Sequence, residues 1–466
     1  MSSRIFIDGQ EADLPVGGLN FVLEKYSPIF NFSEIRGTKT SDFTLPLTAK
    51  NRRIFGHYDN PQFGQTGKLY RCEKMLDGQV IERGFVALKE ASNNGFNLYF
   101  TQNLGEIFGD FQDVTLNKID FGSEPLAGFV PPVNPVLSTA KYCFPQVVNP
   151  TFYGTNTQSG WNGYMNQYTL GAYNAHARVP MFFVHWVLKQ CATLCDFTFK
   201  GAFMDDPTMQ RLIFYNTFSL DDASTLTYAN HLPELSLRAL LKELRLMFNL
   251  YLDFDVATRT LTIDYADSIM ATATTRNWTV KANDTKVRVP EINNRLELDW
   301  ELDGGDELMK VIPANFEKYQ TADNGGGRLF GLKTRLSTLS TDSSGLAMTR
   351  QVGISPRFSQ GNNRFAARLL FWNGLVAGVP TATAAHGNYR LAWHGVNNLR
   401  SRFWDNYEAW RGRTFQVRRP LLLSASDLAA WDFRNKIHVK GVDYYVDSIK
   451  PQLPLRGSTE AVLWRA

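Results

Sequence analysis

Two cysteines one helical turn apart are the reactive groups with the most defined spacing in this sequence. Cys191 and Cys195 lie in VPMFFVHWVLKQCATLCDFTFKG, where Pro180 suits a helix start and apolar residues recur at helical intervals. Two thiols at this spacing could bind a metal or form a redox pair. Both cysteines, however, continue the apolar stripe of the helix. We therefore expect them to be buried, reduced core residues.

The other candidate groups lack partners at the spacing that their chemistry requires. None of the seven histidines stands at metal-ligand spacing, and His185 lies off the apolar stripe of its helix. ELDGGDEL, around Asp303 and Asp306, lacks the alternating oxygen ligands of a calcium loop, so a tight turn explains it better. The hydrolase signatures G-x-S-x-G and H-E-x-x-H do not occur. We predict a non-enzymatic protein without catalytic residues, cofactor or metal.

Arginines and large aromatics are concentrated in NNLRSRFWDNYEAWRGRTFQVRRP. Arg402 precedes Phe403 and Trp404, and Tyr407 and Trp410 follow at helical spacing. Basic residues interleaved with aromatics can hold single-stranded nucleic acid, so transient contact with passing DNA stays open. The same spacing also gives a buried apolar stripe with arginines along its edge. We favour a structural or protein-interface role for this helix.

A strand that runs directly into a helix is the second candidate interface. Phe43 and Leu45 alternate with polar residues, which is typical of a half-buried strand, and Pro46 cannot donate a ladder hydrogen bond. The strand should therefore end there or lie at a sheet edge. Thr48 can cap a helix over Ala49 to Phe55. An internal edge strand covered by its own chain is the alternative interpretation.

Length and composition limit the class of protein. A chain of 466 residues suggests about three domains at roughly 150 residues each. The net charge of +4 is too small by itself to argue for nucleic acid. The four cysteines have no disulfide-framework spacing, and we see no signal peptide and no apolar run of about 18 residues. We expect a soluble chain without membrane insertion.

The order of local signals predicts a multidomain fold, mainly β with α+β, in which two barrel-like β domains flank a small α+β domain. Residues 1–115 contain three hairpin signals and form the first β domain. Residues 116–175 are rich in Gly, Pro, Asn and Tyr and are predicted to be an irregular arm or partner-binding loop. Residues 176–290 alternate helix and strand. Residues 291–466 return to β structure with one aromatic helix.

Several segments together resemble, in order along the chain, segments of phage tail hub proteins from the tail tip or baseplate. They are SDFTLPLTAKNRRIFGH, RVPMFFVHWVLKQCATLCDFTFKGAFMDD, LPELSLRALLKELRLMFNLYLDFD, RFWDNYEAW and VKGVDYYVDSIKPQL. The resemblance spans nearly the whole chain, except residues 116–175. No single motif in it is diagnostic.

The resemblance implies a virion structural protein, commonly a homotrimer, that forms a ring between the tail tube and the tip. It would assemble in the host cytoplasm and contact tail tube, distal tail and tip or fibre proteins. A tail-associated enzyme degrading cell wall or surface glycan is the alternative, and would need paired carboxylates about 5–10 Å apart. The predicted subunit contacts are Phe43, Leu45, Pro46, Arg52, Arg53, Arg402, Phe403, Trp404, Tyr407 and Trp410.

Overall fold

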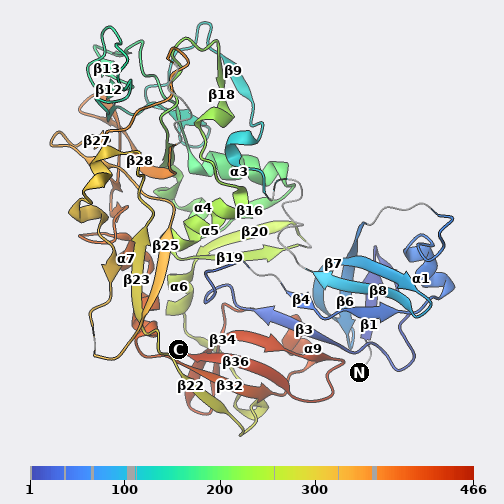
Figure 1. Cartoon of the computed structure of the whole chain (residues 1–466). Helices are drawn as coiled ribbons and strands as arrows, with labels where there is room; N and C mark the ends of the chain where they lie inside the picture. Colours follow the sequence, from blue (N-terminus) through green and yellow to red (C-terminus); the bar gives the residue numbers. More distant parts are fainter. Residues whose placement is uncertain are drawn as a thin grey trace.

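The chain folds mainly as β-sheets, and the two longest of the described helices lie in the middle of the sequence (Figure 1). The computed structural model describes residues 3–35, 38–63, 68–101, 111, 113–256, 258–323, 325–358 and 365–466. Among these residues, no helix is long and apolar enough to cross a membrane. The predicted fold class, mainly β with α+β, is therefore confirmed at the level of secondary structure.

The N-terminal β unit is an antiparallel sheet formed by the first eight strands. They are β1 (Ser3–Ile7), β2 (Gln10–Glu11), β3 (Phe21–Tyr26), β4 (Lys39–Thr40), β5 (Phe43–Leu45), β6 (Leu69–Leu76), β7 (Gln79–Ser92) and β8 (Gly95–Thr101). Asp8-Gly9 and Asp77-Gly78 make tight turns in which both residues have positive φ, the conformation that favours Asp-Gly in two-residue hairpins. These hairpins confirm the local prediction.

The C-terminal β unit combines the end of the chain with a segment from its middle. Its strands are β21 (Thr274–Asn277), β22 (Val287–Pro290), β32 (Phe415–Leu421), β33 (Lys436–Val439), β34 (Val442–Lys450), β35 (Gln452–Leu453) and β36 (Thr459–Arg465). The short helix α9 (Ala425–Ala429) begins at a capping box made by Ser424 and Asp427. A tight turn at Lys440-Gly441, where both residues have positive φ, joins β33 to β34.

Strand β3 belongs to both β units. Leu23 and Glu24 pair with β4 of the N-terminal unit, whereas Lys25 and Tyr26 pair with β34 and Phe21 pairs with β35 of the C-terminal unit. The result is one continuous sheet with the main order β2-β1-β6-β7-β8-β4-β3-β34-β36-β32-β22. Among the described residues, this path runs from β2 to β22, so the two β units belong to a single sheet. Figure 1 shows β3 between the blue and the red strands.

The central region contains the longer helices and several small sheets. Helix α3 (Val184–Leu194) and helix α5 (Leu237–Phe248) pack beside a sheet of β16 (Thr198–Lys200), β20 (Thr260–Tyr265) and β19 (Leu250–Asp255). The Ser236 side chain accepts a hydrogen bond from Ala239 N at the start of α5, and Asn249 ends that helix with left-handed φ. Helix α6 (Ala266–Ala271) follows β20 directly.

Segments on both sides of the predicted domain boundaries pair with this central region. Strand β11 (Val147–Val148) pairs with β27 (Ala347–Met348), and β17 (Leu212–Tyr215) pairs with β28 (Arg368–Val376). Phe144 and Phe152 of the predicted irregular arm are fully buried. The arm thus contributes to the central core, and the second β unit is built from residues 415–466 together with β21, β22 and part of β3. Local composition did not indicate these pairings, because the two strands of each pair lie far apart in the sequence.

Candidate assembly interface

The joint between β5 and helix α1 (Ala49–Ile54) has the predicted local structure. In the part of the chain that the structure describes, β5 pairs with β8 alone, so it lies at an edge, and it ends one residue before Pro46. Thr48 caps α1 by accepting a hydrogen bond of 3.1 Å from Asn51 N. Asn51 Nδ2 in turn donates to the Pro46 carbonyl at 2.9 Å. These bonds fix the direction in which the helix leaves the sheet.

The residues predicted as contacts in this joint divide into an inner and an outer group. Phe43 and Leu45 are buried in the core of the N-terminal β unit. Arg52 forms an ion pair of 2.8 Å with Asp59, and its side chain is 42% exposed. Arg53 is exposed and its Nε contacts the Ala49 carbonyl at 3.4 Å. Of the predicted contacts in this joint, Phe43 and Leu45 are closed to a neighbouring molecule, whereas Arg52, Arg53 and the half-buried Pro46 can reach one. Their role in assembly stays a prediction.

The predicted aromatic helix consists of two short helices, α7 (Leu399–Phe403) and α8 (Asp405–Arg411). Phe403, Trp404, Tyr407 and Trp410 are all at most 5% exposed, so the apolar stripe faces the interior of the same chain. The indole nitrogen of Trp410 donates to the Arg465 carbonyl at 2.7 Å. These four side chains are therefore not a surface that a second subunit can contact.

The aromatic pair of helices is instead the point where distant segments meet. The Phe30 ring lies 4.9 Å from that of Trp410, and the Phe32 ring lies 5.3 Å from that of Trp404. Trp410 also contacts Tyr445 and Trp464 of the C-terminal β unit. Aromatic rings bury large apolar areas in such contacts. The cluster therefore fixes the central region against both β units.

Arg402, the remaining predicted contact, lies on the exposed side of α7. Its guanidinium stands 4.7 Å from the centre of the Tyr389 ring. Arg400, also on α7, forms one ion pair with Asp405 at 2.9 Å and a second with the buried Glu408. Arginine thus lines the outer edge of the aromatic cluster, as the buried-stripe interpretation predicts. Contact of this edge with another subunit or with DNA stays a prediction.

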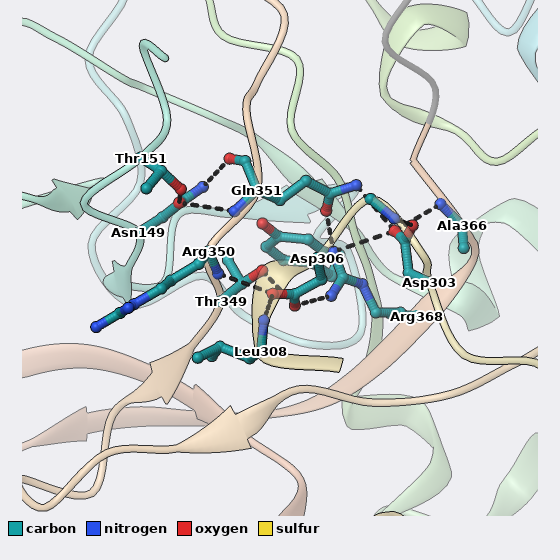
Figure 2. A network of polar contacts seen from close by, with 12 residues as sticks. Asn149, Thr151, Asp303, Asp306, Leu308, Thr349, Arg350, Gln351, Ala366 and Arg368 are labelled. Atoms are coloured by element: carbon teal, nitrogen blue, oxygen red, sulfur yellow. Dashed lines mark hydrogen bonds and ion pairs between the residues drawn. The ribbon is translucent and has the colours of Figure 1, made fainter. Parts of the chain in front are cut away.

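The segment around Asp303 and Asp306 forms a turn that is tied into a buried polar network (Figure 2). Arg368, which is 1% exposed, lies 2.7 Å from Asp306 Oδ2 and 3.4 Å from Asp303 Oδ2. Gln351 Nε2 donates to Asp303 at 2.9 Å, and its side-chain oxygen accepts from Arg368. Asn149 joins the network through two hydrogen bonds to the Gln351 backbone. The expected turn is present, and both carboxylates bind protein donors.

Asp306 is held ionised by its partners. Burial alone would raise its pKa, but Arg368, the Thr349 hydroxyl and the Arg350 and Leu308 N–H groups together bring the pKa below its usual value. Thr349 Oγ1 donates to Asp306 at 2.5 Å and Arg350 N donates at 2.9 Å. Hydrogen bonds to an ionised acceptor are stronger than neutral ones. The network thus clamps four segments that are remote in sequence.

Lys74 is a second buried cation, in the core of the N-terminal β unit. Its Nζ makes no hydrogen bond with the described residues and lies 3.7, 4.6 and 5.4 Å from the ring centres of Phe100, Phe21 and Phe43. Burial lowers the pKa of Lys74 to about 7. The Glu82 carboxylate acts on Lys74 through space but forms its ion pair, at 2.8 Å, with Lys25. Lys74 is therefore caged by aromatics and not paired.

The four cysteines are free and buried, which confirms the prediction for Cys191 and Cys195. Burial raises the pKa of both thiols. His185 is half-buried, and burial lowers its pKa to about 4, so it is neutral at neutral pH. Within the described ranges, no group of three His, Cys, Asp or Glu side chains is arranged to hold a metal ion.

Arg368 and Lys74 were both missed by sequence reasoning. For Lys74 the signal exists: Tyr70, Cys72, Lys74 and Leu76 alternate on one face of β6, so the lysine falls on the apolar side. For Arg368 the signal is weaker. Arg368 is the first residue of the apolar run RLLFW, but no pattern near it in sequence identifies Asp303 and Asp306 as its partners.

Comparison with solved structures gives remote similarities. No family model and no curated protein matches this chain. Among solved structures, a 43 kDa tail protein of prophage MuSo2 from Shewanella oneidensis matches with a TM-score of 0.40 and 9% identity, covering 100% of this chain and 98% of its own. The prophage tail protein gp18 from Listeria monocytogenes gives 0.40 and 9%, covering 100% and 94%. A tail protein from Neisseria meningitidis gives 0.36 and 11%, covering 99% and 95%.

Proposed function

We propose that this chain is a structural hub or adaptor of a phage tail tip or baseplate, and that three copies form a ring between the tail tube and the tip. The observation that carries the proposal is strand β3, which is hydrogen-bonded to β4 on one side and to β34 and β35 on the other. The ordered resemblance of five segments to tail hub proteins supports the same role.

The shared strand makes two β units into one rigid body. Backbone hydrogen bonds on both sides of β3 fix the units in register, and the aromatic cluster around Trp410 holds the central region against them. Three copies would present six β units of related construction. Such a ring can join a six-fold tube to a three-fold tip, which is the task of a hub.

The exposed arginines are the parts of the predicted contacts that remain available in this arrangement. Arg53 and Arg402 are exposed, and the Arg52 side chain is 42% exposed. We propose that these arginines contact neighbouring tail subunits, with transient contact to passing DNA as a secondary role. The proposed partners are the tail tube, distal tail and tip or fibre proteins.

Imaging of the assembled phage particle tests this function. We expect density for the chain at the tip end of the tail, in a ring with three-fold symmetry. Light scattering on the purified chain gives the mass before assembly. A six-copy ring, or a location in the capsid or along the tail shaft, would refute the hub.

One cavity keeps the enzymatic alternative testable. Glu234, Glu301, Asp303 and Arg335 line a cavity of about 320 Å³. Asp303 is bonded to Gln351, Ala366 and Arg368, so it acts structurally there. We expect no turnover of purified cell wall or surface polysaccharide. Turnover that Glu301→Gln abolishes would establish a tail-associated enzyme in place of a purely structural hub.

A further inference from the structure

The C-terminal β unit has an inner sheet face that is buried and an outer face that is partly open. Val417, Leu421 and Leu463 point inward, are at most 2% exposed and belong to the core shared with the N-terminal β unit. Figure 1 shows their strands, together with β22, at the lower end of the molecule. Because side chains alternate between the two faces of a strand, the neighbours of these residues along β32 and β36 lie on the outer face.

The outer face of β22, β32 and β36 is rich in apolar side chains. The strand register sets its residues in two rows across the sheet, Val287, Arg418 and Val462, and then Val289, Gln416 and Trp464. Val287 is 56% exposed, and Leu422, directly after β32, is 58% exposed. The solvated face of an antiparallel sheet is normally polar. Apolar side chains grouped on such a face therefore indicate contact with another molecule.

The central region covers one end of the outer face. Tyr445 of β34, opposite Trp464, is 3% exposed, and its ring lies 6.2 Å from that of Trp410. Trp464 also contacts Trp410 but stays half-buried, and together with Phe30 and Phe330 it lines a cavity of about 520 Å³. The open part of the outer face therefore begins beside an aromatic-lined cavity and runs to β22 at the end of the sheet.

The same unit carries a surplus of positive charge. Residues 274–290 and 415–466 contain 12 Lys and Arg against six Asp and Glu, a net charge of +6, whereas the whole chain carries +4. The rest of the chain has 37 Lys and Arg against 39 Asp and Glu, which is a net charge of −2. Charge that is concentrated in one unit favours a partner of the opposite sign.

The surplus remains at the outer face after the ion pairs of the unit are counted. Three carboxylates of the unit are already paired with cations of the unit, Asp284 with Lys440, Asp427 with Lys281 and Asp443 with His438. In the described part of the chain, the exposed Lys286, Arg288 and Arg418 form no ion pair with a carboxylate, and Arg288 stacks 3.7 Å from the centre of the Phe415 ring. Glu291 and Glu460 flank the face and offset part of this charge. The open face therefore combines apolar side chains with unpaired cations.

We propose that the outer face of β22, β32 and β36 is the docking surface for a segment of a different tail protein, one that carries Asp or Glu beside apolar side chains. This inference rests on the proposed hub function and specifies the chemistry of one partner. The docked segment covers Val287, Val462 and Leu422, and Arg418, in the middle of the face, pairs with one of its carboxylates.

Two other occupants fit this face less well. Nucleic acid is held by phosphate contacts and by bases stacked on exposed aromatic rings, whereas the open part of this face presents aliphatic side chains. A second copy of the chain offers little opposite charge, because the residues outside the unit carry a net charge of only −2. An acidic segment with apolar side chains matches both properties of the face.

A photo-crosslinker on the outer face tests the docking surface in the assembled phage particle. The crosslinking amino acid p-benzoylphenylalanine replaces Val287 in one variant and Leu422 in a second. On irradiation, both variants should join the chain to the same second protein, within a segment that has more Asp and Glu than Lys and Arg. The control position is Leu170 in the central region, which is 106% exposed and should not give this product. Mass spectrometry of the crosslinked peptides identifies the segment.

Charge reversal in the middle of the face tests the electrostatic part of the inference. Arg418→Glu should lower the yield of this product by about tenfold per copy of the chain, or keep the folded chain out of the particle, because like charges then meet in the contact. Arg418→Lys keeps the charge and should retain the product. Lys189→Glu, at an exposed position of α3, reverses one charge elsewhere and should also retain it. Thermal unfolding of each purified variant verifies that it is folded.

Four results would overturn the docking surface. They are a product with a second copy of the chain or with DNA, no product at either position, a crosslinked segment with more Lys and Arg than Asp and Glu, and a product that Arg418→Glu leaves undiminished. A three-fold ring at the tail tip without the expected product would overturn only the docking surface. An acidic partner crosslinked to a chain that lies elsewhere in the particle would overturn only the hub.

Discussion

The N-terminal β unit and the central region each bury a cation, in opposite ways. Arg368 in the centre has Asp303, Asp306 and Gln351 as partners, whereas Lys74 has three phenyl rings and no hydrogen bond among the described residues. Removal of one partner from a buried, hydrogen-bonded ion pair is strongly destabilising, because it leaves the other charge uncompensated. A buried charge without partners costs stability as it stands. The central region therefore depends on each member of its network, whereas Lys74 weakens the β unit that contains it.

Removal of the Arg368 guanidinium is expected to have the largest effect. Arg368→Met leaves Asp303 and Asp306 buried without their counter-charge and should destabilise the central region by about 3–5 kcal/mol. Urea unfolding followed by tryptophan fluorescence measures the change. Arg83→Met, which breaks an exposed pair with Glu73, is the control and should change stability by about 0–1 kcal/mol. Equal losses of unfolding free energy in the two variants would contradict the conclusion that Arg368 neutralises Asp303 and Asp306.

Replacement of Lys74 should act in the other direction. Lys74→Met removes an unpaired ammonium from an apolar site and should stabilise the N-terminal β unit by about 1–4 kcal/mol at pH 7. Hydrogen exchange resolved by peptide measures this locally, because β6 amides report on that unit. Lys89→Met, at a half-exposed position, should leave the exchange unchanged. Loss of protection in Lys74→Met would mean that the cage needs its cation.

The pH dependence of the N-terminal unit follows from the same lysine. The folded-state pKa of about 7 lies below the ordinary value of 10.5, so the unfolded state binds more protons between these values. Stability of the unit should therefore rise as pH increases from 7 to 10.5 and should not change further below pH 7 on account of this group. The difference in free energy of unfolding between wild type and Lys74→Met should be measured at pH 7 and at pH 9. Because the other titratable groups are the same in both proteins, its change with pH reports on Lys74. An identical difference at both pH values would contradict it.

Loss of one hydrogen bond in the central network should have a smaller effect. Thr349→Val removes the hydroxyl that donates to Asp306 at 2.5 Å and should cost about 1–3 kcal/mol. The matched control is Thr338→Val, whose hydroxyl donates to the neutral Leu369 carbonyl at 2.8 Å. Because bonds to an ionised acceptor are stronger, the first variant should lose more stability in urea unfolding. The reverse order would indicate that Asp306 is not ionised.

The smallest expected effect is a change in thiol access. Cys72 lies two residues from Lys74 on the same face of β6, and burial raises its pKa to about 12. Local opening of the unit exposes it, so alkylation at pH 7 followed by mass spectrometry should label Cys72 more slowly in Lys74→Met than in wild type. Cys143, in the central core, is the internal control and should label equally in both proteins. Faster labelling of Cys72 in the variant would show that the lysine stabilises the cage.

The sequence by itself determined the structures whose hydrogen bonds close within a few residues. The Asp8-Gly9 and Asp77-Gly78 turns, the caps at Thr48 and Ser236, and the edge position of β5 before Pro46 all follow from local chain geometry. The apolar stripe of α3 likewise indicated that Cys191 and Cys195 are buried, because helical periodicity fixes which side chains share a face.

Tertiary structure alone decided which of these faces meet. The stripe of Phe403, Tyr407 and Trp410 fits a subunit interface and a core equally well, and Phe30, more than 370 residues earlier, makes it a core. The same holds for Arg368 with Asp306 and for β3, whose two edges pair with strands at opposite ends of the chain. Periodicity specifies that a face is apolar or charged, but its partner is chosen by packing between segments that no local pattern connects.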